Sequence, residues 1–425
     1  MEVSYDLLVI GGGINGAGIA RDAAGRGLSV LLAERGDLAG ATSSSSSKLI
    51  HGGLRYLEHY EFRLVAEALA EREILLRTAR HLVWPVRFVM PHVPELRPRW
   101  MIRAGLFFYD HLARRENGAW RITLSGAREI RALAIVNAAG PWVKRVLNER
   151  LAQPSRDAVR LVKGSHIVLP RLYAGDHAFI LQNDDRRVVF MIPYGDRHTL
   201  VGTTDVPLEN DSGTPQASEA EVAYLCRAVG RYLAQPVGPA QVVWRYAGVR
   251  PLYDDGSSDP SAITRDYTLR LDAEPGEAPV LSVFGGKITT YRRLAEHALE
   301  KLAPYFPGMK GEWTSGTPLL GADFGGSSRE QARDAFFARY AALPQEMLRG
   351  IFRRHGMLAY EVLGDARATG DLGEDFGAGL TGRELRYFAE REWAASAEDV
   401  LWRRTKAGLH MDERRRARLA EALGA

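Results

Sequence analysis

The sequence predicts an α/β and α+β protein with a Rossmann-like dinucleotide domain, a second domain built on an antiparallel sheet, and an all-helical C-terminal domain. Three observations predict this class. A strand, a glycine-rich turn and a helix follow one another at the N-terminus, the hydrophobic period falls to two between residues 159 and 206, and the pattern is helical beyond about residue 313. With 425 residues, the chain can form two or three domains that each bury a core.

The composition limits the class of partner. Hydrophobic residues make up 46% and charged residues 25%, as in globular proteins. A net charge of only +4 argues against nucleic acid, although the pI of about 9.1 permits attraction to acidic substrates or an anionic membrane. The single cysteine, Cys226, cannot form an internal disulfide and suits a reducing compartment. Because we find neither a signal peptide nor an apolar run of roughly 18 residues, we expect a soluble or peripheral protein.

The first motif is typical of a dinucleotide site. Residues 6–10 form an apolar strand, and the glycines at 11, 13 and 16 then give the spacing G-x-G-x-x-G before a helix. These glycines permit a turn, a close approach of the backbone to a pyrophosphate, and packing of helix on strand, while the first-turn N–H groups would hold the phosphates. Glu34 ends the next strand, where an acid can bond a ribose hydroxyl. The motif alone does not separate NAD from FAD.

A serine-rich loop follows at residues 41–56. Its composition alone would predict a flexible linker, but its short length and its His-Gly-Gly-x-Arg-Tyr ending indicate a loop that presents hydroxyls and a cation to a ligand. Residues 61–82 predict a helix that packs on the first domain. Residues 100–109 are apolar with arginines beside them, which fits either a membrane interface or a buried helix.

Further along, the expected elements alternate. Residues 130–136 predict a strand that leads into a small-residue turn at 137–142, and residues 187–193 and 198–205 predict an antiparallel hairpin. We expect a helix over 217–234. A strand ending in Gly285-Gly286-Lys287, before a helix that begins near Thr290, predicts a second turn on the dinucleotide side.

The C-terminal helices carry recognisable caps and a basic end. Capping boxes are predicted at Ser327/Glu330 and Thr381/Glu384, with a further cap at Ser396. The basic end suits a solvated helix face, with an anionic lipid surface as the alternative. Its residues are Arg403, Arg404, Lys406, Arg414, Arg415, Arg416 and Arg418.

Two stretches carry a resemblance to a known family. Residues 9–27, VIGGGINGAGIARDAAGRG, and residues 284–295, FGGKITTYRRLA, resemble the two signatures of the FAD-dependent glycerol-3-phosphate dehydrogenases. Shorter stretches resemble the aerobic, quinone-linked bacterial members: 51–60, 163–166, 202–205, 246–252 and 402–406.

The resemblance implies a reaction and a setting. It implies oxidation of sn-glycerol 3-phosphate to dihydroxyacetone phosphate, with hydride passing to non-covalent FAD and electrons passing to membrane quinone. It implies an FAD domain of the glutathione-reductase type and a peripheral protein, usually a homodimer, on the cytoplasmic face of the bacterial inner membrane. The alternatives are an FAD-dependent amine or amino-acid oxidase of the same fold, which the arginines disfavour, and a flavin-binding protein without turnover.

The expected domains are discontinuous, and one junction departs from the family. Between His111-Leu112 and Glu116-Asn117 the family carries a further segment of several dozen residues. Either the protein lacks it, which would threaten activity, or the sequence omits it, which we favour because both flanks match and a core strand is costly to delete. The expected domains are FAD-binding (1–84, 113–149 and 245–312), substrate-binding (85–112 and 150–244) and helical C-terminal (313–425).

The chemistry selects candidate catalytic and substrate-binding residues. Oxidation of a secondary alcohol needs a base for the hydroxyl proton, and the substrate phosphate needs a clamp, for which arginine is suited. As the base we prefer His166 over His51, with a hydrogen-bonded core histidine as the alternative for His166. Arg250 or Lys287 would stabilise the alkoxide, and the turn at 203–205 would either orient one of these groups or be a plain β-turn. The substrate-binding candidates, each arginine of which could instead be a surface ion pair, are Arg55, Tyr56, Arg250, Arg265 and Lys287.

The cofactor-binding candidates come from four segments: the first turn and the strand after it, the serine loop, the turn after residue 137, and the turn before Thr290. No metal site is expected. The candidates are Gly11, Gly13, Ile14, Asn15, Gly16, Glu34, Arg35, Thr42, Ser43, Ser47, Lys48, Leu49, Ala139, Gly140, Trp142, Gly286, Lys287, Ile288 and Thr289.

Overall fold

The computed structural model describes residues 3–52, 62–91, 130–151, 159–185, 187–209, 214–254, 266–273 and 278–424, together with residues 153 and 157. The chain divides into two compact units, one of residues 1–72 and 86–313 and the other of residues 73–85 and 314–425, and each is described by itself. In the described parts of the chain no helix is long and apolar enough to cross a membrane.

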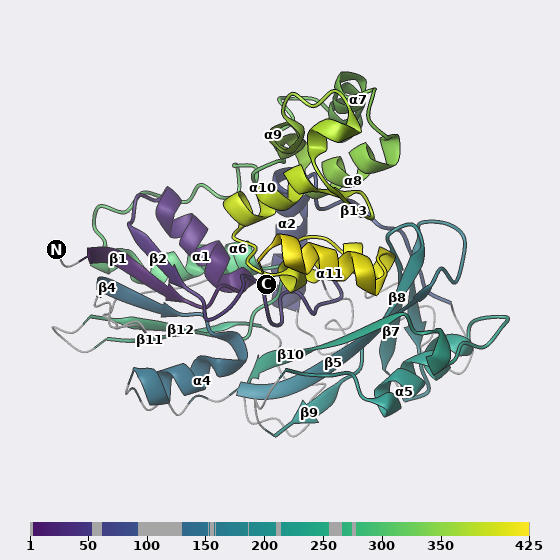
Figure 1. Cartoon of the computed structure of the whole chain (residues 1–425). Helices are drawn as coiled ribbons and strands as arrows, with labels where there is room; N and C mark the ends of the chain where they lie inside the picture. The colour runs from purple at the N-terminus through teal and green to yellow at the C-terminus, as the bar shows by residue number, and fades with distance from the viewer. Residues whose placement is uncertain are drawn as a thin grey trace. The chain divides into compact units, whose positions relative to one another are not determined.

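The first unit contains a five-stranded sheet in the order β11-β12-β4-β1-β2 (Figure 1). Four strands run parallel and β11 pairs antiparallel at the edge. Parallel strands bring their carboxyl ends to one edge of the sheet, so the glycine-rich turn after β1 and the turn after β12 meet there. The strands are β1 (Val3–Ile10), β2 (Val30–Ala33), β4 (Ile130–Asn137), β11 (Thr268–Asp272) and β12 (Val280–Phe284).

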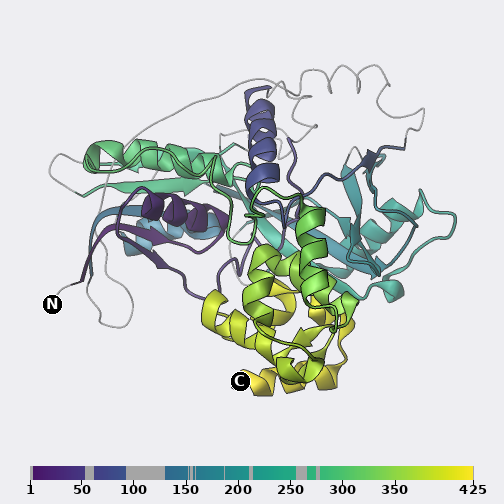
Figure 2. The ribbon, with the colours of Figure 1, turned by 90° about the horizontal axis from the view of Figure 1, so that it is seen from above.

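Helices cover both faces of this sheet. Helices α1 (Ile14–Gly25) and α6 (Tyr291–Leu302) lie side by side on one face (Figures 1 and 2). Their apolar residues, such as Ile19 and Leu294, form one core with strand residues such as Val9. The other face packs beneath α4 (Val143–Arg145), which the 3-10 turn η2 (Gly140–Trp142) precedes and η3 (Val146–Arg150) extends. These layers are the Rossmann-like arrangement that the sequence predicts.

A seven-stranded sheet also belongs to the first unit, in the order β10-β5-β8-β7-β6-β3 with β9 beside β5. The predicted hairpin is β7 and β8, which pair antiparallel up to Tyr194 opposite His198. Strand β10 pairs with β5, so it belongs to this sheet, although residues from 245 onward were assigned to the FAD domain. The strands are β3 (Phe88–Val89), β5 (Val159–Pro170), β6 (Ala178–Gln182), β7 (Val188–Tyr194), β8 (His198–Gly202), β9 (Val206–Leu208) and β10 (Trp244–Tyr253).

The two faces of this sheet differ in chemistry. Ile167 and Val201 belong to the face that packs on α5 (Glu219–Gly230) and forms an apolar core with it. On the opposite face, Tyr246 pairs with His166 and His166 with Gly202 in register. The three positions therefore form one row across β10, β5 and β8, in which the Tyr246 and His166 side chains lie next to each other. This row is the floor of the candidate active site.

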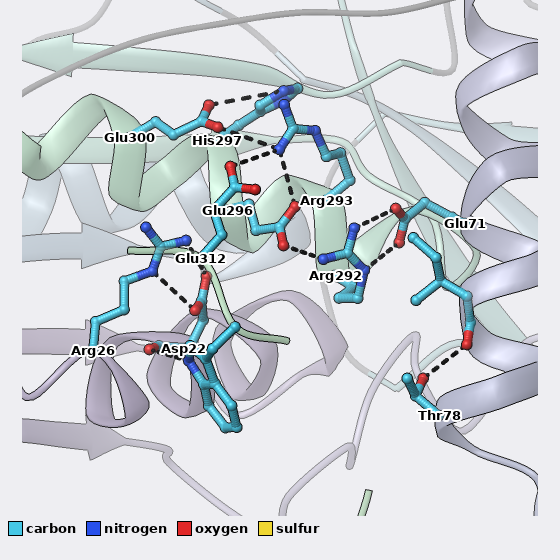
Figure 3. A network of polar contacts seen from close by, with 12 residues as sticks. Asp22, Arg26, Glu71, Thr78, Arg292, Arg293, Glu296, His297, Glu300 and Glu312 are labelled. Carbon is cyan, nitrogen blue, oxygen red and sulfur yellow. Dashed lines mark hydrogen bonds and ion pairs between the residues drawn. The ribbon is translucent and has the colours of Figure 1, made fainter. Parts of the chain in front are cut away.

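A buried network of charges fixes α6 in the first unit (Figure 3). Arg292 is 5% exposed and donates from Nε to Glu71 of α2 (Phe62–Thr78) at 2.8 Å, and it also pairs with Glu296. Arg293 pairs with Glu296 at 2.9 Å and with Glu300 at 3.2 Å. Buried charges are costly unless paired, so these contacts hold α6, and with it the turn that precedes α6, against α2.

The second unit is helical, with one short hairpin that the sequence did not predict. Strands β13 (Asp375–Gly377) and β14 (Leu380–Thr381) pair because the Gly-Ala-Gly turn at 377–379, all with positive φ, reverses the chain. The helices are α7 (Arg329–Arg339), α8 (Gln345–His355), α9 (Ala359–Leu363), α10 (Gly382–Glu392) and α11 (Glu413–Ala422), and short helical turns at Asp399–Arg404 and Ala407–His410 precede α11.

The caps of this unit agree with the sequence in part. The predicted box at Ser327/Glu330 is wrong by one residue, because Ser328 caps α7 and exchanges hydrogen bonds with Gln331. Ser327 with Glu330 and Ser328 with Gln331 both have the spacing of a capping box, so the spacing alone could not choose between the two pairs. Thr381 caps α10 as predicted, but the Glu384 carboxylate binds Arg354 instead of closing the box.

Candidate active site

The glycine-rich turn brings backbone against backbone at the start of α1. Gly11 has a φ of +106°, and a Cβ at Gly16 would lie 1.9 Å from the Gly11 carbonyl oxygen, so neither position accepts a side chain without a shift. The N-cap is Gly13, which has no side chain to accept from the first-turn N–H groups, and Ile14 N donates to Ser43 Oγ at 2.9 Å. This helix N-terminus suits an anion such as a pyrophosphate.

Glu34 and Arg35 lie beside this turn. Glu34 accepts from Gly12 N at 2.7 Å and from Gly36 N at 3.1 Å, so its carboxylate holds the local backbone. A carboxylate offers about four acceptor positions, so it can bind a ribose hydroxyl in addition. The Arg35 guanidinium lies 4.0 Å from the ring of Trp142, which places both predicted cofactor residues at the same edge of the sheet.

The serine loop is packed rather than flexible. It joins the dinucleotide turn to the floor of the seven-stranded sheet through contacts of nearly every residue from 42 to 48, which supports the ligand-presenting alternative over the linker. Besides Ser43, these contacts are Thr42 Oγ1 to Val249 O at 2.6 Å, Tyr246 OH to Ser46 O at 3.1 Å, and Ser47 Oγ to His166 Nε2 at 2.9 Å.

Lys48 binds the backbone of the serine loop. Its Nζ donates to Ser44 O at 2.7 Å and Ser46 O at 2.9 Å, and it lies 4.9 Å from the ring of Tyr246. The ammonium therefore sets the curvature of the loop and adds positive charge above the floor.

His166 is buried on that floor. It is 2% exposed, and its ring stacks on Tyr246 with centroids 4.9 Å apart and planes 11° apart. Gly202 lies against the ring edge, since a Cβ there would be 2.1 Å from His166 Cδ2. Burial lowers the pKa of His166 well below its usual 6.5, and the charges of Lys48 and Arg250 act in the same direction. The imidazole is therefore neutral at pH 7.

Arg250 is held by three consecutive residues. It donates to Asp205 Oδ1 at 2.6 Å, to Thr203 Oγ1 at 2.9 Å and to Thr204 O at 3.4 Å. Its guanidinium lies over Gly164, where a Cβ would be 2.4 Å from one terminal nitrogen. Arg250 and Asp205 are 26% and 28% exposed, so the guanidinium is fixed yet accessible.

The turn before α6 approaches both the helix N-terminus and the loop. Asn15 donates from Nδ2 to Gly285 O at 3.2 Å, and Thr289 Oγ1 lies 3.3 Å from both the N and the O of His51. The Nζ of Lys287 is buried in this turn, whereas the His51 side chain is exposed. The turn thus brings His51 and Lys287 to the same edge as the dinucleotide turn.

Other candidates are placed less completely. Leu49 and Ile288 flank the contacts just described, and Ala139 and Gly140 follow β4 at the shared edge. The substrate candidates Arg55, Tyr56 and Arg265, and the apolar stretch 100–109, lie outside the described residues.

Sequence reasoning overlooked the glycines at 164 and 202 of the floor, where Gly248 is the third glycine. Each lies within a strand, a position where glycine signals a close approach of another group. A Cβ at Gly248 would be 2.7 Å from Ser45 Cβ, so here the serine loop itself is that group. This signal was available in the sequence.

The residues present fit FAD. The uncapped α1 N-terminus, the Glu34 carboxylate and the Arg35–Trp142 pair lie along one edge of the five-stranded sheet. In addition, the carboxamide oxygen of Asn15 is buried and has no hydrogen-bond partner in the described structure, so it can accept from a ligand. A dinucleotide with its pyrophosphate at α1 satisfies these groups.

Family comparison covers nearly the whole chain. Residues 6–116 and 103–292 match the family described as FAD dependent oxidoreductase, and residues 313–423 match the C-terminal domain of alpha-glycerophosphate oxidase. The two ranges of the first match overlap at 103–116, around the junction where the resemblance predicts a further segment.

Curated relatives are similar over their full length. The chain is 47% identical to a glycerol-3-phosphate dehydrogenase of Pseudomonas aeruginosa, covering 99% of this chain and 95% of that protein. It is 45% identical to the aerobic glycerol-3-phosphate dehydrogenase of Escherichia coli (98% and 97%) and 43% identical to the D-erythritol 1-phosphate dehydrogenase of Brucella abortus (98% and 97%).

The alignment with the Pseudomonas protein contains positions that this chain does not fill. It runs over 486 positions, whereas this chain has 425 residues, so at least 61 positions hold no residue of this chain. The junction at which the resemblance predicts a further segment lies outside the described residues.

A solved structure agrees with the fold. The glycerol-3-phosphate dehydrogenase of Bacillus halodurans, complexed with FAD, aligns with a TM-score of 0.71 and 24% identity, covering 99% of this chain and 94% of that one. The predicted fold class, the resemblance and FAD as the cofactor of the family are thereby confirmed. The chain belongs to the FAD-dependent oxidoreductases and, within them, to the family of glycerol-3-phosphate dehydrogenases.

Proposed function

We propose that this protein oxidises sn-glycerol 3-phosphate to dihydroxyacetone phosphate and passes the electrons through FAD to membrane quinone. The observation that carries the proposal is the set of contacts made by the serine loop. The loop contacts the α1 N-terminus through Ser43, the sheet floor through Ser47 and the turn before α6 through His51. One segment therefore brings the cofactor end of the fold to the polar floor on which a small phosphorylated alcohol can bind.

Bound FAD supplies the hydride acceptor; the residues of the chain supply binding and proton transfer. We assign the substrate phosphate to Arg250, because its planar donors suit a phosphate and its contacts with Thr203 and Asp205 fix its direction. Lys287, on the turn before α6, adds charge that would stabilise a developing alkoxide. Arg55, Tyr56 and Arg265 stay predicted contributors to the same site.

We assign the hydroxyl proton to His51 rather than to His166, which the sequence favoured. The Nε2 of His166 is bonded to Ser47 and its ring is covered by Tyr246, so a substrate proton reaches it only through Ser47. His51 is exposed, and Thr289 anchors its backbone beside the cofactor turn. His166 then keeps Ser47 in place.

Replacement of each histidine tests this assignment. General base catalysis commonly contributes about 100-fold or more, so His51→Gln should slow anaerobic flavin bleaching by about that factor, while His166→Gln should chiefly reduce flavin content. A wild-type bleaching rate in flavin-replete His51→Gln would return the role to His166.

Anaerobic mixing tests the reaction itself. Glycerol 3-phosphate should bleach the yellow protein at once, because bleaching requires transfer of a hydride, whereas glycerol without phosphate should bleach it far more slowly. D-Erythritol 1-phosphate, named for the Brucella relative, should be tested in parallel. If only the erythritol phosphate bleaches the flavin, the substrate assignment is wrong; if an amino acid or amine does, the oxidase alternative holds.

The membrane assignment has structural support in the second unit. Three large apolar side chains of this unit are exposed: Leu82 by 51%, Trp84 by 39% and Leu320 by 82%. The guanidinium groups of Arg329 and Arg353 lie 4.9 and 5.1 Å from the Trp84 ring, and among the described residues neither forms an ion pair with a carboxylate. We propose that these five residues, the Trp84 patch, contact an anionic bilayer through apolar insertion and charge together.

The basic C-terminus contributes less than expected to such a surface. Arg404 pairs with Glu392 at 3.5 Å and Arg418 donates to Glu374 at 2.8 Å, so much of its charge is neutralised within the chain. This favours the solvated-face alternative for that stretch. The proposal also keeps the homodimer, the cytoplasmic face of the inner membrane and non-covalent binding of FAD. It keeps the three domains as well, with β10 counted in the substrate-binding domain.

A further inference from the structure

A buried carboxylate lies behind the sheet floor, on the face opposite to His166. Glu221 is the third residue of α5 and is 7% exposed. Its Oε2 accepts from Ser218 N at 2.9 Å, which completes the capping box of α5, and lies 2.9 Å from Lys163 Nζ. A helix cap needs no more than this one oxygen.

The second oxygen of Glu221 binds two hydroxyl groups that take no part in the helix cap. Oε1 accepts from Thr204 Oγ1 at 2.9 Å and from Ser165 Oγ at 2.8 Å. Thr204 Oγ1 in turn accepts from Ser165 N at 2.9 Å, so the threonine hydroxyl is fixed from both sides. Glu221 thereby ties the chain just after β8 to strand β5 and to helix α5.

Thr204 is the middle of the three residues that hold Arg250. Its side chain reaches through to the α5 side, whereas its neighbours Thr203 and Asp205 both accept from the guanidinium. The Thr204 carbonyl also faces Arg250, at 3.4 Å. A shift of Thr204 would therefore move every acceptor that sets the direction of Arg250.

We propose that Glu221 is a positioning residue for Arg250: through Thr204 it holds the 203–205 segment that aims the guanidinium at the substrate phosphate. The inference rests on the proposed role of Arg250 in binding that phosphate. Glu221 touches neither substrate nor cofactor, and its effect is expressed only through Arg250. A charged carboxylate suits the task because its hydrogen bonds are stronger than those of a neutral acceptor.

The test is a double-mutant cycle on flavin-replete protein. Glu221→Gln keeps the size of the side chain but replaces one acceptor oxygen by a donor, so one of its two sets of partners must be lost. We expect KM for glycerol 3-phosphate, and the inhibition constant of inorganic phosphate, to rise about tenfold, with a smaller change in kcat. In an Arg250→Lys background the same substitution should have little further effect, because both act on one contact.

Three further variants separate the positioning of Arg250 from folding. Ser218→Ala removes the side-chain cap of α5 but leaves the Thr204 anchor, so it should lower the melting temperature without changing KM. Thr204→Val removes the anchoring hydroxyl while Thr204→Ser retains it, so the valine variant should repeat the Glu221→Gln effect and the serine variant should restore phosphate affinity. These variants keep the test valid if Glu221→Gln does not fold.

The outcomes distinguish the inference from the function on which it rests. If Arg250→Lys is impaired but Glu221→Gln and Thr204→Val keep wild-type KM, the positioning role is wrong and Glu221 is only a cap. Equal losses in both backgrounds, or an equal rise of KM in Ser218→Ala, would also overturn it. If Arg250→Lys itself has wild-type KM, the phosphate role of Arg250 fails, and the inference fails with it.

Discussion

A methyl group added at Gly164 should misdirect Arg250 without unfolding the protein. An alanine Cβ at this position would lie 2.4 Å from a terminal nitrogen of Arg250 and 2.7 Å from Thr203 Oγ1. Ordinary contacts begin near 3.5 Å, so the guanidinium must move by about 1 Å. Because Arg250 is a long flexible side chain and the Thr203 hydroxyl can turn about one torsion, the clash can be relieved without a backbone shift. The alanine also loses less entropy on folding than glycine does.

The expected cost falls on catalysis. A hydrogen bond to a charged group is worth about 1.5–3 kcal/mol, which corresponds to roughly ten- to a hundredfold in affinity or rate. Gly164→Ala should therefore lower kcat/KM for glycerol 3-phosphate by about that factor, with a melting temperature and flavin content close to those of the wild type. Arg250→Lys, which keeps charge but loses the planar fork, should cost at least about tenfold, and the two losses should not add.

Gly16→Ala is the matched control. Here a Cβ would lie 1.9 Å from the Gly11 carbonyl oxygen, a backbone atom that cannot move without shifting the turn. This variant should therefore lose both flavin and stability. Steady-state kinetics and thermal unfolding of both variants decide the matter. Wild-type kcat/KM in Gly164→Ala, or a parallel loss of flavin in both alanine variants, would refute the idea that the orientation of Arg250 determines substrate binding.

Three further predictions concern the cofactor, the membrane and pH. Gly13→Val should expel FAD, because a side chain there enters the space between α1 and Ser43; a full complement of flavin in the purified variant would contradict the placement. Leu82→Gln should weaken co-sedimentation with anionic vesicles, whereas Leu133→Gln, at a comparably exposed leucine outside the Trp84 patch, should not. Equal binding of both variants would remove the patch from the proposed membrane surface. Burial raises the pKa of Glu221, but hydrogen bonds from Lys163, Ser218 and Ser165 outweigh burial and lower the pKa from 4.5 to about 2. The ionised carboxylate therefore stabilises the fold above pH 4.5, and this stabilisation is lost as the pH falls toward 2. The melting temperatures of wild type and Glu221→Gln should accordingly differ most near neutral pH and converge in acid; a constant difference would show that the charge is not responsible.

Local signals in the sequence predicted what depends on neighbours in the chain. The G-x-G-x-x-G spacing placed the turn before α1, because each glycine acts within a few residues of the next. The period of two likewise located the hairpin of β7 and β8. Such patterns state which residues share a face but not which strands pair, so the pairing of β10 with β5 was not predicted.

The roles within the site depend on contacts distant in sequence. His166 was preferred as the base because it lies in a motif, but its partners are Ser47, 119 residues earlier, and Tyr246 on another strand. Those contacts bury the ring and lower its pKa, and neither is visible in the local sequence. For Arg250 the sequence went further: its residue type suggested a phosphate clamp, and the turn at 203–205 was one candidate to orient Arg250 or Lys287. Only the fold shows that this turn holds Arg250.

The glycines of the floor limit where the substrate can bind. Glycine within a strand costs roughly 0.5–1 kcal/mol relative to alanine, so three such positions give up stability that the fold must recover elsewhere. The space above each glycine is taken by the protein itself: Arg250 lies over Gly164, the His166 ring against Gly202, and Ser45 against Gly248. We therefore expect the proposed substrate to bind not in these spaces but between the guanidinium of Arg250 and His51. A substrate bound there would face the cofactor edge, as hydride transfer requires.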